Sequence, residues 1–301
     1  MAGDTATRSD VEFTSDGVVC RAWLYTPDRP GPHPIIVMAH GLGGVRDMRL
    51  DAFAERFTTT GYACLVFDYR YFGASDGQPR QLLDIKSQLT DWAAAIGYAR
   101  SRGDLDPSRI VLWGTSFSGG HVIATAARDH GIAAAIAQCP FTDGIASASA
   151  MYPITSAKVT VMGIADVIAH KLGRPAIMVD LAGPPLSAAL MTAPDAMPGY
   201  LALAAAGSAH RNEVAARVAL QIPLHRPGLQ TGDIQCPILF CVCETDSVAP
   251  AKATLQHARR APRGEVRLYR EGHFDIYRGD AFEKVVADQI AFLHHHVPVT
   301  N

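Results

Sequence analysis

The feature that most constrains this fold is an alternation of short, wholly apolar runs with segments of helical spacing. The first run, residues 35–39, is apolar at every position and rich in β-branched side chains. A strand is apolar throughout when both faces of its sheet are covered, as in parallel sheets. Residues 49–60 then show helical spacing that stops before Gly61, and a second apolar run follows at 62–67. These segments predict one β-α-β unit.

The same alternation continues along the chain. Helices are expected near 83–101, 117–128, 251–259 and 281–295, and strands near 110–113, 132–139, 238–242 and 266–269. Two earlier strand-like segments flank Asp16-Gly17, which is a strong signal for a β-hairpin. The pattern predicts an α/β fold, with a mostly parallel sheet covered by helices on both faces and entered by an antiparallel hairpin.

The alternation breaks between the predicted strands at 132–139 and 238–242. We expect residues 1–140 and 236–301 to form the core, and residues 141–235 to form an inserted helical cap. Five of the eight methionines lie in this segment, and residues 144–210 contain six charged side chains. Such a weakly charged cap suits an apolar acyl or alcohol group, because thioether side chains adapt to irregular ligands. The same methionines could instead simply pack the cap onto the core.

Composition narrows the classes of partner and compartment. The formal net charge is -2 and Lys and Arg are scattered, so no basic patch indicates nucleic-acid binding. The six cysteines form no CxxC pair, which favours buried thiols in a reducing compartment. The polar N-terminus and the lack of a long apolar stretch predict a cytoplasmic protein without a membrane partner. We expect no metal and no cofactor, and an apolar cap surface could support a homodimer.

The run Gly114-Thr115-Ser116-Phe117-Ser118 lies between a predicted strand and a predicted helix. This is the context of a nucleophile elbow, where a sharp turn exposes a serine to its base beside a helix N-terminus. The usual pattern is Gly-x-Ser-x-Gly, and Ser118 departs from it at the last position. A phosphate-binding turn is the alternative, but the run lacks the spacings typical of one.

Three further motifs follow predicted strands in order. They are His40-Gly41-Leu42-Gly43-Gly44, the run from Asp68 to Gly77 containing Arg70, and a late pair that contains Asp246 and Gly272-His273. With these motifs the chain resembles the α/β-hydrolase superfamily over nearly its whole length, nearest to its dienelactone-hydrolase-like and dipeptidyl-peptidase-like esterase branches.

The resemblance implies a role for each matching residue. Ser116 would be the nucleophile, His273 the general base on an exposed loop, and Asp246 the acid that orients it, with Asp143 as the alternative acid. The backbone N–H groups of Leu42 and Phe117 would form the oxyanion hole. For Asp68 and Arg70 we favour a structural ion pair, and for His40 and His121 packing and hydrogen bonding.

These residues predict a serine hydrolase that cleaves a carboxylic ester of a small, largely apolar acyl substrate through an acyl-enzyme on Ser116. Thioester, lactone, amide or carbon–carbon hydrolysis and acyl transfer remain alternatives, because one triad serves them all. A hydrolase fold that only binds a ligand is a further alternative.

Overall fold

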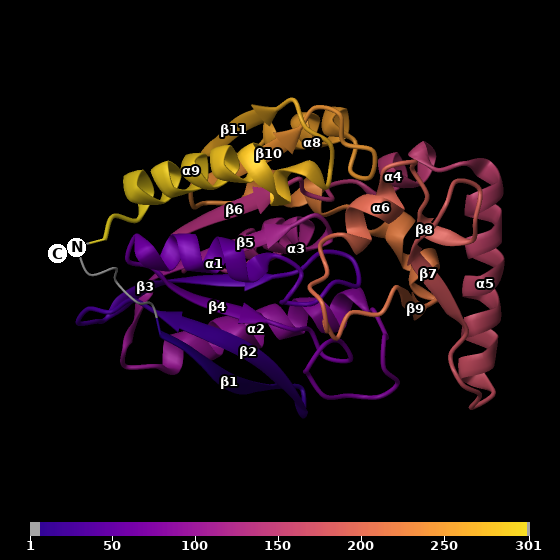
Figure 1. The fold of residues 1–301 in the computed structure, drawn as a ribbon, viewed down its shortest axis with the longest axis horizontal. Helices are drawn as coiled ribbons and strands as arrows, with labels where there is room; N and C mark the ends of the chain where they lie inside the picture. The colour runs from indigo at the N-terminus through magenta and orange to yellow at the C-terminus, as the bar shows by residue number, and fades with distance from the viewer. Residues whose placement is uncertain (1–6, 300–301) are drawn as a thin grey trace.

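A computed structural model describes residues 7–299, and within them the chain builds an eight-stranded sheet in the order β1-β2-β4-β3-β5-β6-β10-β11 (Figure 1). The strands are β1 (Thr7–Ser15), β2 (Val18–Thr26), β3 (His33–Ala39), β4 (Ala63–Phe67), β5 (Leu105–Thr115), β6 (Ala134–Gln138), β10 (Ile238–Cys243) and β11 (Gly264–Tyr269). The pairs β1–β2 and β2–β4 are antiparallel, and every later neighbouring pair is parallel. The predicted fold class is confirmed.

Helices cover both faces of this sheet. They are α1 (Leu50–Thr59), α2 (Ile85–Ser101), α3 (Phe117–Ala126), α8 (Ala251–Ala258) and α9 (Gly279–His296). Helix α1 contacts α9 on one face, whereas α2 contacts α3 on the other. Strands β3, β4, β6 and β10 are buried at every position, because both of their faces are covered.

The N-terminal hairpin turns at the residues that the sequence indicates. Asp16 and Gly17 have φ values of 49° and 78°, so both central residues adopt the left-handed conformation of a type I′ turn. This turn matches the twist of the flanking strands and fixes the β1–β2 register, in which Ser15 faces Val18.

The segment between β6 and β10 lies at one end of the molecule (Figure 1). It contains α4 (Gly144–Ala150), α5 (Pro153–Lys171), β7 (Met178–Ala182), β8 (Ala189–Met191), α6 (Ala196–Leu201), β9 (Glu213–Ala215), α7 (Val218–Gln221) and the 3-10 segments η1 (Ile222–Leu224) and η2 (Pro227–Asp233). The predicted helical cap contains the helices expected, but it is not made of helices alone, because β8, β7 and β9 form a small sheet. Strands of three to five residues are too short to show a period of two in the sequence. The division into a core and an inserted cap stays a prediction.

Two predictions from composition can be compared with the structure. All six cysteines lie within the described residues, where they are free and buried, as expected for small apolar side chains. None of the helices in residues 7–299 combines the length and the hydropathy needed to cross a bilayer.

Candidate active site

Ser116 stands between the end of β5 and the start of α3. Its φ and ψ of 55° and -120° are strained for a residue with a side chain, as expected of a nucleophile elbow. Only small neighbours fit around this turn. A Cβ atom on Gly41 would lie 2.9 Å from the Ser116 Cβ, and one on Gly119 would lie 2.8 Å from the Cβ of Pro140. The turn therefore places the Ser116 hydroxyl at the carboxyl edge of the sheet.

Ser118, which departs from the usual elbow pattern, has a buried hydrogen-bond partner. Its Oγ lies 2.8 Å from the hydroxyl of Tyr69, which accepts a hydrogen bond of 2.9 Å from the Trp92 indole. Because the Tyr69 oxygen accepts from Trp92, its own hydrogen is free to reach Ser118. A serine side chain is thus accommodated at this position. The tight backbone contact of the elbow involves Gly114, because a Cβ atom there would clash with the carbonyl oxygen of Ser118.

The structure brings together Ser116, His273 and Asp246. His273 Nε2 lies 3.0 Å from Ser116 Oγ, and His273 Nδ1 lies 2.7 Å from Asp246 Oδ2. A carboxylate on Nδ1 selects the tautomer with its hydrogen there, which leaves Nε2 free to accept the serine proton. The arrangement can therefore move a proton from the hydroxyl to the ring.

His273 is not exposed as expected, because only 1% of it is accessible. The ring of Phe274 packs edge-on against it, with 4.9 Å between centroids. Tyr200 of α6 packs in turn on Phe274. The sequence shows a loop with a glycine directly before His273 but gives no sign that a residue more than 70 positions upstream covers it.

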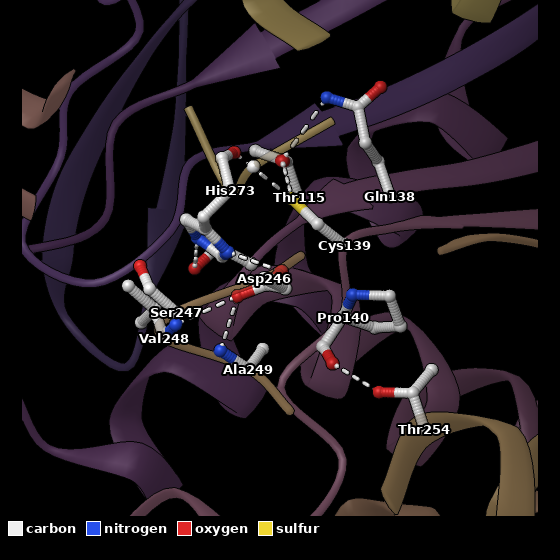
Figure 2. A network of polar contacts seen from close by, with 12 residues as sticks. Thr115, Gln138, Cys139, Pro140, Asp246, Ser247, Val248, Ala249, Thr254 and His273 are labelled. Carbon is white, nitrogen blue, oxygen red and sulfur yellow. Dashed lines mark hydrogen bonds and ion pairs between the residues drawn. The ribbon is translucent and has the colours of Figure 1, made fainter. Parts of the chain in front are cut away.

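Asp246 is held by the backbone that follows it. Its Oδ1 accepts hydrogen bonds from the N–H groups of Val248 and Ala249 at 2.8 and 2.6 Å, so Oδ2 is left to face His273 (Figure 2). These bonds fix the carboxylate in its orientation toward the imidazole.

Asp143, the alternative acid, is engaged elsewhere. Its Oδ1 caps α4 by accepting from the N–H groups of Ile145 and Ala146, and its Oδ2 lies 2.9 Å from Arg226 and 3.3 Å from His257 Nε2. Against the effect of burial, these hydrogen bonds hold the pKa of Asp143 below its usual value. It is thus Asp246, not Asp143, that the structure brings to His273.

Leu42 and Phe117, the predicted oxyanion donors, both line the cavity that Ser116 faces. Phe117 is the first residue of α3, so its N–H has no acceptor within the helix. Among the described residues, no hydrogen-bond acceptor is found for the N–H of either residue. Both groups are therefore available to an oxyanion.

Tyr200 is a site residue that sequence reasoning missed. Its buried hydroxyl donates a 2.8 Å hydrogen bond to the carbonyl of Leu42, and so ties the segment between β6 and β10 to the oxyanion loop. No motif marks this tyrosine, because its role depends on contact with a loop 158 residues earlier.

An apolar cavity of about 240 Å³ opens beside Ser116. Its walls are Leu42, Phe117, Phe141, Ser147, Ala148, Ala150, Met151, Tyr152, Leu190, Met191, Thr192, Ala193, Pro194, Ile222, Ser247 and Val248. No charged side chain of the described residues lines it, so it suits an apolar group. Two of the five methionines in the segment between β6 and β10 form part of this wall.

The two remaining motif residues form separate ion pairs. Asp68 accepts hydrogen bonds from the N–H groups of Arg46 and Ala74, at 2.8 and 3.0 Å, and its carboxylate lies 3.4 Å from the Arg46 guanidinium. Arg70 instead donates to Asp91 at 2.7 Å. Both have the structural role that we expected, but they do not pair with each other.

His40 and His121 are structural, as predicted. His40 Nε2 bonds the carbonyl of Met48 at 3.2 Å, and burial lowers the pKa of His40 to about 4. His121 Nε2 lies 2.8 Å from Gln88 Oε1, and burial lowers its pKa as well. Neither ring contacts Ser116 through a hydrogen bond found in the described part of the chain.

Cys139, Asp246 and His273 bring possible metal-ligand atoms within 4.8 Å of one another. A metal would need the thiolate, but burial raises the pKa of the Cys139 thiol to about 12. Asp246 and His273 Nδ1 are also already bonded to each other. This donor set fits a metal poorly, and the prediction of no metal stays a prediction.

Comparison with known proteins places this geometry in a family. The model for serine aminopeptidase, S33, matches residues 30–281. The quorum-quenching protein AidA of Acinetobacter baumannii is 60% identical over 290 residues, covering 96% of this chain and 95% of that protein.

Two fungal proteins are similar over about half of the chain. The polyketide transferase grgF of Penicillium sp is 36% identical over 51% of this chain and 52% of its own length. The crystal structure of the α/β hydrolase GrgF superposes over 96% of this chain and 99% of that one, with a TM-score of 0.84 and 27% identity. The thiohydrolase aneE of Aspergillus aculeatus is 38% identical over 46% of this chain and 43% of its own length.

The resemblance to the α/β-hydrolase superfamily is thus confirmed, and the chain, an enzyme of hydrolase type, belongs to the serine aminopeptidase S33 family of α/β hydrolases.

Proposed function

We propose that this enzyme cleaves a carboxylic ester of a small-molecule, largely apolar acyl substrate through an acyl-enzyme on Ser116. The observation that carries the proposal is the hydrogen-bonded series from Ser116 Oγ through His273 to Asp246, at 3.0 and 2.7 Å. A hydroxyl is a weak nucleophile, and a base in hydrogen-bond reach of it, itself oriented by a third group, is the arrangement that activates it.

The reaction would proceed in two halves. His273 Nε2 takes the Ser116 proton as Oγ attacks the ester carbon, and then gives that proton to the departing alcohol. Water enters, loses a proton to the same nitrogen and attacks the acyl carbon, and Ser116 Oγ leaves and regains its hydrogen. Asp246 stabilises the imidazolium that forms in each half.

The negative oxygen of both tetrahedral intermediates would lie between the N–H groups of Leu42 and Phe117. The N-terminal end of α3 adds a partial positive charge at this point. A single donor of this kind typically contributes about 3 kcal/mol to the lowering of the barrier.

The substrate class is inferred from the apolar cavity and from relatives. The uncharged walls beside Ser116 favour an apolar acyl group, and residues 141–235 would act as the cap that supplies most of these walls. The relative that is 60% identical is named for quorum quenching, and we extend that role to this chain, whose substrate would then be a signalling molecule. A lactone is a cyclic ester and falls within this proposal.

Thioester hydrolysis is the second candidate, because one fungal relative is named a thiohydrolase. The same triad and oxyanion hole would serve it without change. Turnover of a thioester panel with weak turnover of the matching oxygen esters would favour this candidate.

The test is labelling and turnover with Ser116→Ala, using Ser118→Ala as the matched control two residues away. A fluorophosphonate should add one mass equivalent to the native protein and to Ser118→Ala, and none to Ser116→Ala. Release of acid from methyl esters should follow the same pattern. Full activity of a correctly folded Ser116→Ala variant would contradict the proposal.

A cytoplasmic location, the absence of a membrane partner and a homodimer stay predictions. For the homodimer, the relevant surface is helix α5, whose apolar side chains Ile154, Val161, Ile164 and Ile168 are exposed, together with Leu172 directly after the helix.

A further inference from the structure

Two cavities of very different size meet at Ser116. The large apolar cavity holds about 240 Å³, and a second cavity, on the His273 side, holds about 10 Å³. The smaller one is bounded by His40, Tyr200, Leu203, His273, Phe274 and Tyr277, among others. A volume of this size accommodates about one water molecule.

The position of His273 decides which part of a substrate enters which cavity. The departing alcohol must receive its proton from His273 Nε2, and the incoming water must give its proton to the same atom. Both therefore occupy the side of Ser116 that His273 lines. His273 borders the small cavity and is not part of the wall of the large one, so the acyl group belongs in the large cavity.

The small cavity is kept narrow by side chains of α6 and of the residues after it. Tyr200 is bonded to the Leu42 carbonyl at 2.8 Å, and its ring packs on Phe274 with 6.2 Å between centroids. Leu203 and Phe274 are 3% and 6% exposed. Enlarging this side would require the Tyr200 bond to break or these side chains to repack.

We propose that the small volume on this side makes water the acceptor and restricts the substrate to esters with a small leaving group. The inference rests on the proposed function and adds to it. A bulky alcohol can neither leave through this side nor enter it as an acyl acceptor. The chain would thus be a hydrolase and not an acyl transferase, although one of its relatives is named a polyketide transferase.

The first experiment compares methyl and benzyl esters of one fatty acid, whose alcohols are of similar acidity but different size. We expect kcat/KM for the methyl ester to exceed that for the benzyl ester at least tenfold. With 1-butanol added, the product should remain the free acid. Equal rates for the two esters, or a butyl ester as the main product, would overturn the inference.

The second experiment opens each cavity separately. Leu203 lines only the small cavity and Leu190 only the large one, so Leu203→Ala and Leu190→Ala are matched variants. Leu203→Ala should raise the benzyl-to-methyl ratio at least fivefold, whereas Leu190→Ala should shift the preferred acyl length and leave this ratio unchanged. An unchanged ratio in folded Leu203→Ala would overturn the inference. Leu203→Val replaces Leu203→Ala if thermal melting shows that the latter is unfolded.

Mass spectrometry separates failure of this inference from failure of the proposed function. If neither ester acylates Ser116, the proposed function fails. If both esters acylate it at equal rates, the proposed function holds and only the inference about size is wrong.

Discussion

The two walls of the active site differ in chemistry. The wall made by the loops at the carboxyl edge of the main sheet is polar, and Ser116, His273 and Asp246 in it are each fixed by short hydrogen bonds. The wall made by the segment between β6 and β10 is apolar and contributes Met151, Leu190 and other uncharged side chains. Under the proposed function, the sheet edge would set the reaction, whereas the segment between β6 and β10 would set which molecule undergoes it.

The two regions are alike in how they bury charge. Asp91 in the core is 0% exposed and bonds Arg70 at 2.7 Å, and Asp166 in the inserted segment is 0% exposed and bonds Arg217 at 2.7 Å. Each pair ties its own region together. Removing one partner from each pair therefore tests whether the two regions unfold as one unit.

The largest expected effect is on the polar wall. Asp246→Asn should lower kcat by about 10⁴-fold, because the amide no longer selects the productive imidazole tautomer. Asp143→Asn should stay within a few-fold of the native rate, since Asp143 caps α4 and bonds Arg226. Steady-state kinetics on a methyl ester measures both. A larger loss from Asp143→Asn than from Asp246→Asn would assign the acid to Asp143.

The next effect compares the two buried ion pairs. Breaking such a pair typically costs about 3–5 kcal/mol, because a buried charge is left unpaired. Asp91→Asn should lower the free energy of unfolding of the main sheet by this amount in a urea titration. Asp166→Asn should instead expose the inserted segment to limited proteolysis before the sheet unfolds. If the main sheet and the segment between β6 and β10 unfold together in either variant, the two regions do not unfold independently, and the prediction is wrong.

Acid should destabilise the chain through its buried histidines. Burial lowers the pKa of His40 to about 4 and also lowers that of His121, whereas unfolded histidine titrates near pH 6.5. The stability gained from keeping these rings neutral is thus complete above about pH 6.5 and is lost as the pH falls toward 4. Protonation of the His40 ring should remove about 1–2 kcal/mol by pH 5, and His121 should add to this loss.

Urea titrations between pH 7 and pH 5 measure this loss. His121→Asn should make the free energy of unfolding depend less on pH, because one of the buried rings with a lowered pKa is gone. A free energy of unfolding that does not change over this range would contradict the prediction.

The smallest expected effect on kcat comes from the hydrogen bond that joins the two walls, between Tyr200 and the Leu42 carbonyl. Tyr200→Phe removes the hydrogen bond to the Leu42 carbonyl, a loss of about 1 kcal/mol, and should lower kcat about fivefold through a less ordered oxyanion loop. KM should stay near its native value, because the ring still fills its place. Tyr98→Phe, which loses a hydrogen bond to Arg102 outside the site, is the control. If Tyr200→Phe and Tyr98→Phe lower kcat equally, Tyr200 does not position the oxyanion loop.

The core could be predicted because its signals are local. Short apolar runs rich in β-branched residues, such as residues 35–39, favour strands with two covered faces, and Asp16-Gly17 can adopt the two left-handed conformations of its turn. The motif residues Ser116, Asp246 and His273 each follow a strand. Because parallel strands end at one edge, the sequence was sufficient to expect them together.

Other features required the folded chain. The small sheet β8-β7-β9 has strands too short to be recognised, and the burial of His273 depends on Tyr200 and Phe274, which reach it from different parts of the sequence. Asp246 and Asp143 both follow strands, and local sequence does not separate them. The two acids differ in the partners that their carboxylates contact, which are Arg226 for Asp143 and His273 for Asp246.

The sequence by itself thus determined the fold class, because strand periodicity and turn chemistry act over a few neighbouring positions. Through its resemblance to a known family it also predicted which residues would perform acyl chemistry. Only the tertiary structure decided which acid faces His273, how the site is covered and how unequal its two cavities are. Those properties arise from side chains that are distant in sequence, and their packing leaves no local pattern to read.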